Sequence, residues 1–432
     1  MKLIFFLIAF CLIFIRMYFS WTGHDHGNGN EGNMTISSDN FIEQMKWSGQ
    51  IKFNEDESAI QSISAGGYLK YRKNDVKVVA ESNLHGEISY ELYDGHNKLN
   101  MDDRGKKLVS EAIKEMIAYG FDAEGRMDRI YKKGGKAALL NELDNIKFDN
   151  VKGIYLDRLL STDSNSQEDL TLIAKKIDSM GSDIEKSKYF SRFSIKELED
   201  SQTNRVFYGG VQHMNSDLDK GNILMHLIQQ GSLTDINFDH VLDLIKHFNS
   251  DLDKLNLTKE LIKRDDVTEV RLDNVLGMVS NFNSDLDKQD LLRQLMDRGD
   301  ITGKHVDKLL DLVSHFGSDL DKENVLHQLM DKKEVDSTHF DQLIDIISRF
   351  GSDLDRENMY KKFFEVNGLT EVQWTHLLNN VALINADIDK SNLLVEIAGK
   401  MPKTDNLKSV YLRVAKTIGS DPDFGKAIRA IE

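Results

Sequence analysis

The sequence predicts an α+β protein with an N-terminal membrane segment, a small antiparallel β-sheet domain and an α-solenoid of two-helix repeats of the HEAT or TPR kind. Two observations carry this prediction. A string of the form Ser-Asp-Leu-Asp-Lys returns every 34 residues through the larger part of the chain. Only two prolines occur in 432 residues. Because proline costs about 3 kcal/mol inside a helix, this composition favours long uninterrupted helices.

The first 21 residues predict a signal anchor or a signal peptide. An apolar run covers residues 3–15 behind Lys2 and resumes after Arg16 as far as Trp21. A full span needs about 20 residues, which this segment nearly reaches. We therefore expect contact with the membrane through residues 3–21 and a single-pass anchor in the cell envelope, with an extracytoplasmic body. The alternative is a secreted or periplasmic protein after signal cleavage.

The lone cysteine, Cys11, lies in this apolar segment, so the rest of the chain contains no thiol. This excludes an intramolecular disulfide and a cysteine-built zinc or iron–sulfur site. An exported protein without disulfides is more typical of a bacterium than of an animal secretion.

Residues 22–45 are rich in Gly, Asn and Ser and predict a flexible linker. From Trp47 onward apolar and polar residues alternate in short runs separated by turn residues, so residues 46–100 predict a small antiparallel β domain. We expect four or five strands with one solvated face. The predicted core of this domain consists of Ile51, Phe53, Leu69, Val76, Val78, Ile88, Tyr90 and Leu92.

Residues 101–147 predict linking helices and a partial first repeat. One helix is expected around Val109–Ala118 after Asp102, and a short helix after Asp122 as its N-cap. Four apolar residues then match the second helix of a repeat: Leu139, Leu140, Leu143 and Ile146.

The repeat array is expected over residues 148–432, with about eight units. Numbering each unit from the Ser of the repeated string, position 2 is Asp in all nine copies of the string. Positions 8, 9, 12 and 13 are mainly apolar and form one face of a first helix, and position 19 is a helix N-cap residue. A second apolar face follows. Position 34 is Gly or Asn throughout, which predicts a left-handed residue at the end of the second helix.

The repeated string has three possible roles. It imitates the start of a calcium-binding loop, but Lys replaces the turn glycine and the bidentate Glu is missing. Helix capping is the second role, and an inter-repeat ladder, in which each Asp binds the next unit's amide or a Lys, is the third. We predict capping and a ladder, and the structural repeat caps are then Asp183, Asp217, Asp251, Asp285, Asp319, Asp353 and Asp387.

A second set of aspartates falls at two sites four residues apart on the second helices. Such a charged face is often only solvated, but it can also attract a basic partner or a cation. The candidate partner-binding stripe consists of Asp239, Asp243, Asp273, Asp307, Asp311, Asp341 and Asp345.

Charge and motifs exclude several function classes. With 55 basic against 71 acidic residues and a net charge of −16, the chain lacks the basic footprint of a nucleic-acid binder. No zinc-peptidase, nucleophile-elbow or P-loop motif occurs, and a Gly-rich string at residues 27–32 has no strand before it. We expect no enzyme activity, no cofactor and no metal.

The order of the segments resembles the extracytoplasmic region of some bacterial membrane proteins of the antirepressor-metallopeptidase type, which are related to β-lactam sensors. The matching residues are Gly49-Gln50-Ile51-Lys52-Phe53, Ala123-Glu124-Gly125-Arg126, Gly134-Gly135 and the Ser-Asp-x-x-Lys series. The peptidase, its zinc motif and the Ser-x-x-Lys acylation site are absent from this sequence. The resemblance therefore implies an interaction or sensing module without proteolysis or acylation.

We expect a membrane-tethered, extracytoplasmic, non-enzymatic scaffold that binds a protein or peptide through the solenoid face. The alternative function is an envelope sensor whose β domain recognises a small ligand or a glycan.

Overall fold

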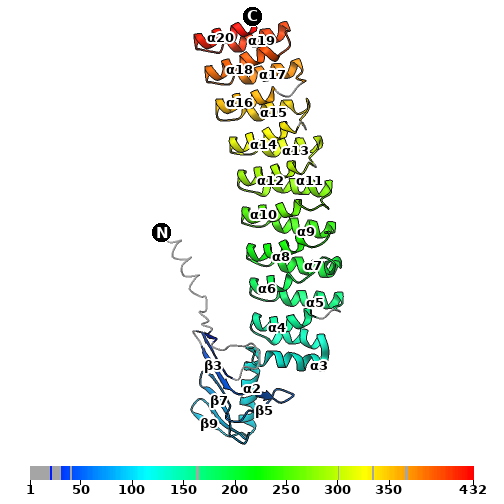
Figure 1. The fold of residues 1–432 in the computed structure, drawn as a ribbon. Coiled ribbons are helices and arrows are strands. Elements are labelled where there is room, and N and C mark those ends of the chain that lie inside the picture. Colours follow the sequence, from blue (N-terminus) through cyan, green and yellow to red (C-terminus); the bar gives the residue numbers. More distant parts are fainter. Residues whose placement is uncertain are drawn as a thin grey trace. The chain divides into compact units, whose positions relative to one another are not determined.

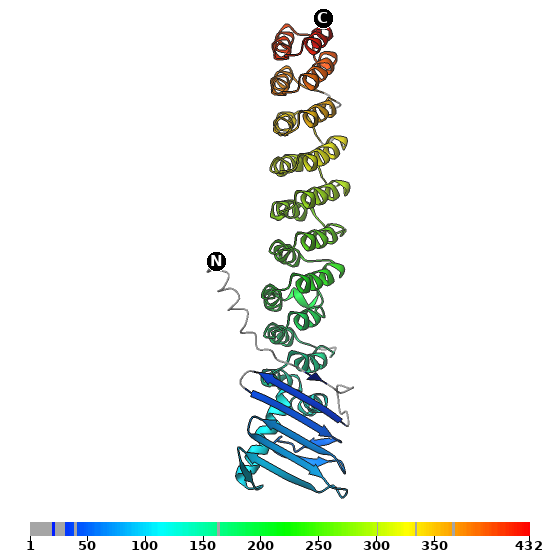
Figure 2. The same cartoon turned by 90° about the vertical axis from the view of Figure 1, so that its left-hand side faces the viewer.

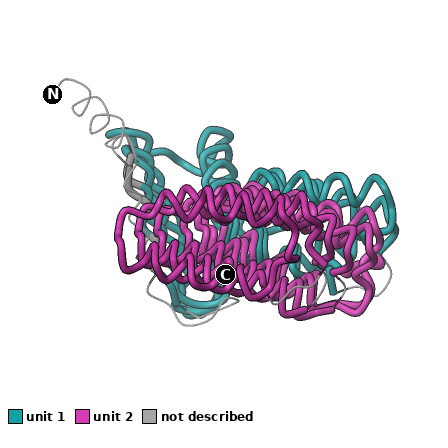
Figure 3. Tube along the Cα trace, turned by 90° about the horizontal axis from the view of Figure 1, so that it is seen from above, with its two compact units in different colours: residues 1–193, 197–213 teal, residues 194–196, 214–432 magenta. Residues whose placement is uncertain are grey.

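The computed structural model describes residues 20–21, 31–38, 41–161, 165–299, 301–332, 335–364 and 368–432. These residues form two compact units (Figure 3). Unit 1 comprises the described residues up to Phe193 together with 197–213, and unit 2 comprises 194–196 and 214–432. The boundary between the units therefore falls inside the predicted repeat array.

Unit 1 begins with a seven-stranded antiparallel sheet in the order β1-β2-β3-β6-β7-β8-β9, beside a two-stranded ribbon of β4 and β5 (Figure 2). The strand bounds are β1 Ser20–Trp21, β2 Glu31–Ser38, β3 Phe41–Ser48, β4 Ile51–Phe53, β5 Ile60–Ile63, β6 Tyr68–Lys73, β7 Val76–Ser82, β8 Ile88–Asp94 and β9 Asn97–Leu99. The antiparallel sheet that the alternating pattern predicts is confirmed, with more strands than expected.

The linker predicted over residues 22–45 is wrong for its second half. Strands β2 and β3 pair antiparallel over eight residues each, from Glu31↔Ser48 to Ser38↔Phe41, and β3 pairs in turn with β6. Gly, Asn and Ser are poor strand formers locally, but strand formation depends on the neighbours that a strand pairs with. Buried Glu43 and Met45 alternate with exposed Lys46 on β3, which is the pattern of a half-buried strand.

The core of unit 1 lies between the sheet, the β4–β5 ribbon and helix α2 (Asp103–Ala118). Five of the eight predicted core residues are buried there, and Val76, Ile88 and Tyr90 pack against it partly buried. Helix α2 starts after the N-cap Asp102, as predicted, because that carboxylate accepts the backbone N–H groups of Arg104 and Gly105. Its apolar face adds Val109, Ile113 and Met116 to the core.

The predicted localisation is wrong. Among the helices of the described residues, none is both long enough and apolar enough to cross a membrane. This finding overturns the single-pass membrane anchor and the localisation based on it. The membrane contact expected through residues 3–21 stays a prediction. Residues 1–19 lie outside the described residues. The last two residues of the expected anchor, Ser20–Trp21, form strand β1 and pair with β2 through Thr35 and Met34.

The remaining helices of unit 1 begin the repeats. Their bounds are α3 Ala123–Glu142, α4 Asp149–Leu160, α5 Gln167–Asp178, α6 Asp183–Phe190 and α7 Ser201–Gln212, with 3-10 turns η1 Leu143–Asn145 and η2 Glu197–Glu199. Helix α3 is longer than the short helix expected after Asp122 and bends at Gly135, whose φ of 63° and ψ of −152° are not helical. Leu139, Leu140 and Leu143 are buried, as the partial first repeat predicts.

Unit 2 consists of stacked helical pairs in two layers (Figures 1 and 2). The first helices are α8 Asp217–Gln229, α10 Asp251–Ile262, α12 Asp285–Asp297, α14 Asp319–Asp331, α16 Asp353–Phe363 and α18 Asp387–Lys400. The second helices are α9 Asp235–Lys246, α11 Glu269–Met278 with η3 Val279–Asn281, α13 Gly303–Ser314, α15 Phe340–Ser348, α17 Glu371–Val381 and α19 Asp405–Ala415. Helix α20, Asp421–Ile431, ends the array alone. Each first helix packs on the next first helix, and each second helix on the next second helix.

The two-helix interpretation of the repeat is confirmed by these bounds and by the core. In the α14–α15 pair, for example, Val325, Leu326 and Leu329 of the first helix and Phe340 and Leu343 of the second are buried. The Ser at position 1 is the N-cap of most first helices, and its hydroxyl accepts the N–H of position 4, as Ser284 does from Asp287. Position 19 caps the second helices, except at Asp336, where α15 begins later, after His339.

The left-handed turn predicted at position 34 is wrong. None of the Gly or Asn residues there has a positive φ among the described residues. The residue lies one position before the N-cap of the next first helix, and its backbone N–H points at the position 2 carboxylate of its own repeat, as Gly317 does toward Asp285. Gly or Asn at position 34 therefore lies next to a carboxylate that binds its backbone N–H. The backbone conformation at this position is not left-handed.

Candidate interaction surfaces

In several repeats the Asp at position 2 binds the first residue of the next repeat. Within unit 2, one oxygen of Asp251, Oδ2, accepts the backbone N–H groups of Asn283 at 2.7 Å and Ser284 at 3.1 Å. The other oxygen, Oδ1, lies 3.0 Å from Nζ of Lys254 on the same helix turn. Asp285, Asp353 and Asp387 in unit 2, and Asp149 in unit 1, likewise accept the backbone N–H of position 34 in their own repeat and that of position 1 in the next repeat. Asp217 and Asp319 accept the N–H of position 34, from Asn249 and Gly351.

These contacts favour the charged form of the aspartates. Burial alone would raise the pKa of Asp251 and of Asp285, but the Lys ammonium and the two backbone N–H groups outweigh it and hold both pKa values below the ordinary value of Asp. The pKa of Asp319 is lowered in the same way, against its burial, by the N–H of Gly351 and by Lys322. Asp183, the remaining predicted cap, is the first residue of α6.

The Lys at position 5 completes this junction. In four successive repeats its ammonium lies over the ring of the Phe at position 33, at 5.6 to 6.0 Å from the ring centroid. The pairs are Lys220 with Phe248, Lys254 with Phe282, Lys288 with Phe316 and Lys322 with Phe350. The ring belongs to the end of the second helix in the same repeat, so the Lys joins the two helices of its pair.

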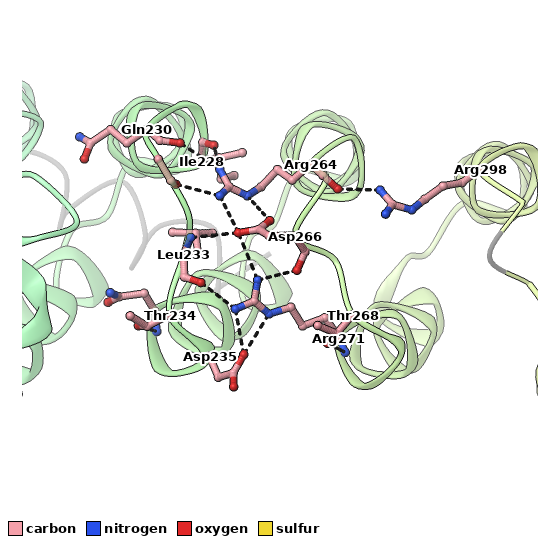
Figure 4. Close-up of polar contacts among 12 residues, drawn as sticks. Ile228, Gln230, Leu233, Thr234, Asp235, Arg264, Asp266, Thr268, Arg271 and Arg298 are labelled. Carbon is pink, nitrogen blue, oxygen red and sulfur yellow. Dashed lines mark hydrogen bonds and ion pairs between the residues drawn. The ribbon is translucent and has the colours of Figure 1, made fainter.

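A second ladder, which the sequence interpretation missed, runs in the opposite direction. Arg264 and Arg298 stand at position 15, just after the first helix, and each guanidinium donates to carbonyl oxygens at the end of the preceding first helix (Figure 4). Arg298 donates to Ile262 and, at 2.8 Å, to the carbonyl of Arg264. Lys400 makes the equivalent contact with Phe364 at 3.4 Å. Cations are favoured at helix C-termini, where carbonyl groups lack helical partners.

The junction of the α8–α9 and α10–α11 pairs carries a denser polar network (Figure 4). Asp266 accepts both Nε and Nη2 of Arg264, at 2.9 and 2.8 Å, and the backbone N–H of Leu233 at 3.1 Å. The buried Arg271 donates to the carbonyl of Leu233 at 2.7 Å and to Asp235 at 2.8 Å. The Arg264–Asp266 pair lies within one repeat, and the contacts with Leu233 and Asp235 cross to the preceding repeat, so the network fixes the junction of the two repeats.

The predicted acidic stripe lies on neighbouring second helices. All seven aspartates are exposed, and α9, α11, α13 and α15 pack on one another in that order. Some carboxylates are paired with the next repeat: Asp239 accepts Asn274 at 3.1 Å, and His376 lies 2.8 Å from Asp341 and 3.1 Å from Asp345. The carboxylates of Asp243 and Asp311 have no hydrogen bond or ion pair with another described residue, since only their carbonyl oxygens are bonded.

A periodic row of exposed apolar side chains, which the sequence interpretation also missed, lies at the N-terminal ends of the first helices. Position 3 is apolar in every repeat of unit 2, and its exposed fraction lies between 56% and 68%. We call this set the leucine row: Leu218, Leu252, Leu286, Leu320, Leu354 and Ile388. The signal is present in the sequence, because the third residue of the repeated string is Leu or Ile in seven of its nine copies.

In unit 1, the segments 123–126 and 134–135, which carry two of the sequence motifs, have structural roles. The buried Arg126 pairs with Glu57 and Glu142, each at 2.7 Å, and lies 3.4 Å from the hydroxyl of Tyr155. Burial would lower the pKa of Arg126, but the two carboxylates outweigh it and raise the pKa. Arg126 therefore ties α3 to α4 and to the β4–β5 ribbon, and Gly135 bends α3.

A buried carboxylate in the sheet domain forms a further polar cluster. Glu43 on β3 lies 3.6 Å from Nζ of Lys73, which also lies 3.3 Å from Glu115 of α2. The pKa values of Tyr71 and Tyr119 are raised, first by burial and then by the negative charge of Glu43. The phenols stay protonated and face a carboxylate, an arrangement that holds strands and α2 together.

Within the described ranges, no group of three or more His, Cys, Asp or Glu residues could hold a metal ion. The acidic stripe and the leucine row expose charge and apolar area to solvent, and the ladders join repeats.

Comparisons with known proteins identify no family. No model of a known protein family matches the chain, and no curated protein matches it. One similar solved structure comes from work on the computational design of self-assembling cyclic protein homooligomers. It is 9% identical over 72% of this chain and 96% of that chain, with a TM-score of 0.13. That score is too low for any argument about fold or function. The resemblance to antirepressor-metallopeptidase proteins stays a prediction.

Proposed function

We propose that this protein is a non-enzymatic scaffold whose repeat array binds a basic protein or peptide along the acidic stripe. The observation that carries the proposal is the combination of exposure and continuity in the stripe. All seven aspartates face solvent on four second helices that pack side by side. Stacked repeats offer extended surfaces of this kind to elongated partners.

The charges of the stripe support a basic partner. Asp243 and Asp311 keep carboxylates that no described residue pairs with, so a Lys or Arg can bind there without displacing an existing contact. The chain as a whole carries a net charge of −16, which steers cations toward it and accelerates their association at low salt. The alternative function, a sensor that recognises a ligand through the β domain, stays a prediction.

The test replaces four carboxylates of the stripe by their neutral amides. The variant carries Asp239→Asn, Asp243→Asn, Asp307→Asn and Asp311→Asn, and partners are captured in cells by crosslinking, identified by mass spectrometry and then produced pure. We expect the purified partner to bind the full chain at least tenfold more weakly after the substitution, with a smaller salt dependence of Kd.

The matched control changes the same number of charges on unit 1, at the exposed residues Asp103, Glu111, Glu124 and Asp128. These substitutions to Asn or Gln should change Kd less than twofold. If both variants bind the partner as the unchanged chain does, or both lose the same affinity, the stripe is not the binding surface and the proposal fails.

A further inference from the structure

The leucine row is not explained by the fold. Position 3 is the second residue of the first helix, where it neither caps the helix nor packs in the core. The junction is already completed by the Ser at position 1, the Asp at position 2 and the Lys at position 5, as in Ser284, Asp285 and Lys288. Polar and acidic residues are favoured in the first turn of a helix. A largely exposed leucine there contributes little to folding.

Repetition of the sequence alone does not explain the row either. At position 21, another exposed site of the same period, the repeats of unit 2 have diverged between apolar and polar residues. These residues are Ile236, Val270, Lys304, Thr338, Val372 and Asn406. Position 3 is apolar in the same six repeats. Single exposed apolar residues are ordinary on a protein surface, but aligned ones on adjacent elements mark interaction sites.

Unpaired carboxylates accompany the row. The Asp at position 4 follows each leucine, and the carboxylates of Asp253, Asp287, Asp321 and Asp355 have no hydrogen bond or ion pair with another described residue. Only their backbone N–H groups are bonded, to the N-cap serines. The row therefore presents apolar side chains beside negative charges. This composition disfavours a second copy of the chain, because two such rows would bring like charges together.

We propose that a basic, amphipathic helical segment of a partner protein docks along the leucine row. Its apolar side chains cover the leucines, and its Lys or Arg residues pair with the position 4 aspartates. Packed helices lie about 8–10 Å apart, so the leucines of successive first helices recur at about that interval. One heptad of an α-helix advances about 10.5 Å. A helix with one apolar residue per heptad on its docking face therefore meets one leucine per repeat.

The test uses the full chain and a synthetic probe, a 28-residue helical peptide with a Leu at every seventh residue flanked by Lys. Kd is measured by fluorescence anisotropy. A second peptide has the same composition with its leucines out of register. The test variant carries Leu252→Ser, Leu286→Ser and Leu320→Ser. The matched control variant carries Ile236→Ser, Val270→Ser and Val372→Ser, at positions on the second helices with exposed fractions of 64% to 76%.

We expect the in-register peptide to bind the full chain, the test variant to bind it at least tenfold more weakly, and the control variant to differ less than twofold. All substituted side chains are largely exposed, so the melting temperature of both variants should match that of the unchanged chain. The acidic-stripe variant described above should still bind the peptide, which separates this inference from the proposed function.

Four results would overturn the inference. They are no binding of the in-register peptide, equal binding of both peptides, equal loss in both variants, and a dimer in sedimentation analysis that the three Leu→Ser substitutions convert to a monomer. The last result would assign the row to a second copy of this chain.

Discussion

The aspartate at position 2 uses its two oxygens for different purposes. In Asp285, Oδ2 accepts the N–H groups of Gly317, the last residue of its own repeat, and Ser318, the first residue of the next, and Oδ1 binds Lys288 in its own helix turn. Hydrogen bonds to a charged group contribute about 1.5–3 kcal/mol each. One side chain thus makes the hydrogen bonds and the ion pair at the junction between two repeats. This explains why Asp occurs at position 2 in every copy of the string.

The lowered pKa values of these aspartates predict acid sensitivity. A carboxylate whose folded pKa lies below its unfolded value stabilises the fold above the unfolded value, about 3.9, and loses that contribution as the pH falls through the folded pKa. In urea unfolding followed by circular dichroism, the free energy of unfolding should fall between pH 5 and pH 3. The triple variant Asp251→Asn, Asp285→Asn and Asp319→Asn should be less stable at pH 7 and show a smaller fall. Substituting Asp239, Asp243 and Asp311 by Asn is the control and should keep the original pH dependence.

Glycine at position 34 gives a second test at single residues. Gly317 has no positive φ, and a Cβ built on it would lie 3.5 Å from Oδ2 of Asp285, an ordinary contact. Gly299, in contrast, has a φ of 83° with open space around it. We expect Gly317→Ala to change the free energy of unfolding by less than about 0.5 kcal/mol, and Gly299→Ala to lower it by about 1–2 kcal/mol. A larger loss of unfolding free energy for Gly317→Ala would support the left-handed turn that the sequence predicted.

At the scale of helices, both ends of a first helix are completed by a neighbouring repeat. The Asp at position 2 accepts the backbone N–H of the Ser that begins the next repeat, and the basic residue at position 15 donates to carbonyl oxygens of the preceding repeat. Each charge sits where the helix dipole favours its sign. The Ser, Asp and Lys of the string could be assigned to the helix start from their residue types. Position 15 could not, because the basic residues there are interrupted by others, such as Gln230.

Arg264 tests this backward contact. Arg264→Ala removes the donors to the carbonyls of Ile228 and Gln230 and leaves Asp266 without its bidentate partner. We expect the free energy of unfolding to fall by about 2–3 kcal/mol. Arg264→Lys should recover part of the loss, because Lys400 makes the equivalent contact in another repeat. Arg293→Ala, at an exposed site, is the control and should stay within about 0.5 kcal/mol. Equal effects of the Arg264→Ala and Arg293→Ala changes would remove any role for the carbonyl contacts.

At the scale of the whole molecule, the repeats were predictable and the N-terminal part of the sheet was not. The same apolar positions recur from repeat to repeat, as with Leu292 and Leu326 at equivalent sites. The helical pattern can therefore be recognised from many copies. The residue pattern of strands β2 and β3 occurs only once, in a stretch whose local composition favours a linker. The pairing of β3 with β6 is a contact between distant segments, and local composition does not report such contacts. The boundary between the two units has no marker in the repeat spacing either.

The modular packing of unit 2 predicts local responses to damage. Leu309 of α13 is fully buried, and Leu309→Ala should cost about 2–5 kcal/mol. Because each repeat contacts mainly its neighbours, stability in such arrays is a sum of repeat and interface contributions. In hydrogen exchange followed by mass spectrometry, the substitution should accelerate exchange most in α12–α15 and least in α18–α20. Uniform acceleration across α8–α20 would mean that unit 2 unfolds as a single cooperative body.

The two ladders also give the array a chemical polarity. In unit 2, Asp251, Asp285, Asp353 and Asp387 at position 2 each accept the backbone N–H of position 1 in the repeat that follows. Where position 15 is basic, the repeat is a donor toward the one before it, as at Arg264 and Arg298. A cut between two repeats would therefore leave an unpaired acid on one piece and an unpaired base on the other. Reversing the direction of one repeat would place acid against acid or base against base at its junctions. Repeats can therefore be added to the array only in the same direction, head to tail.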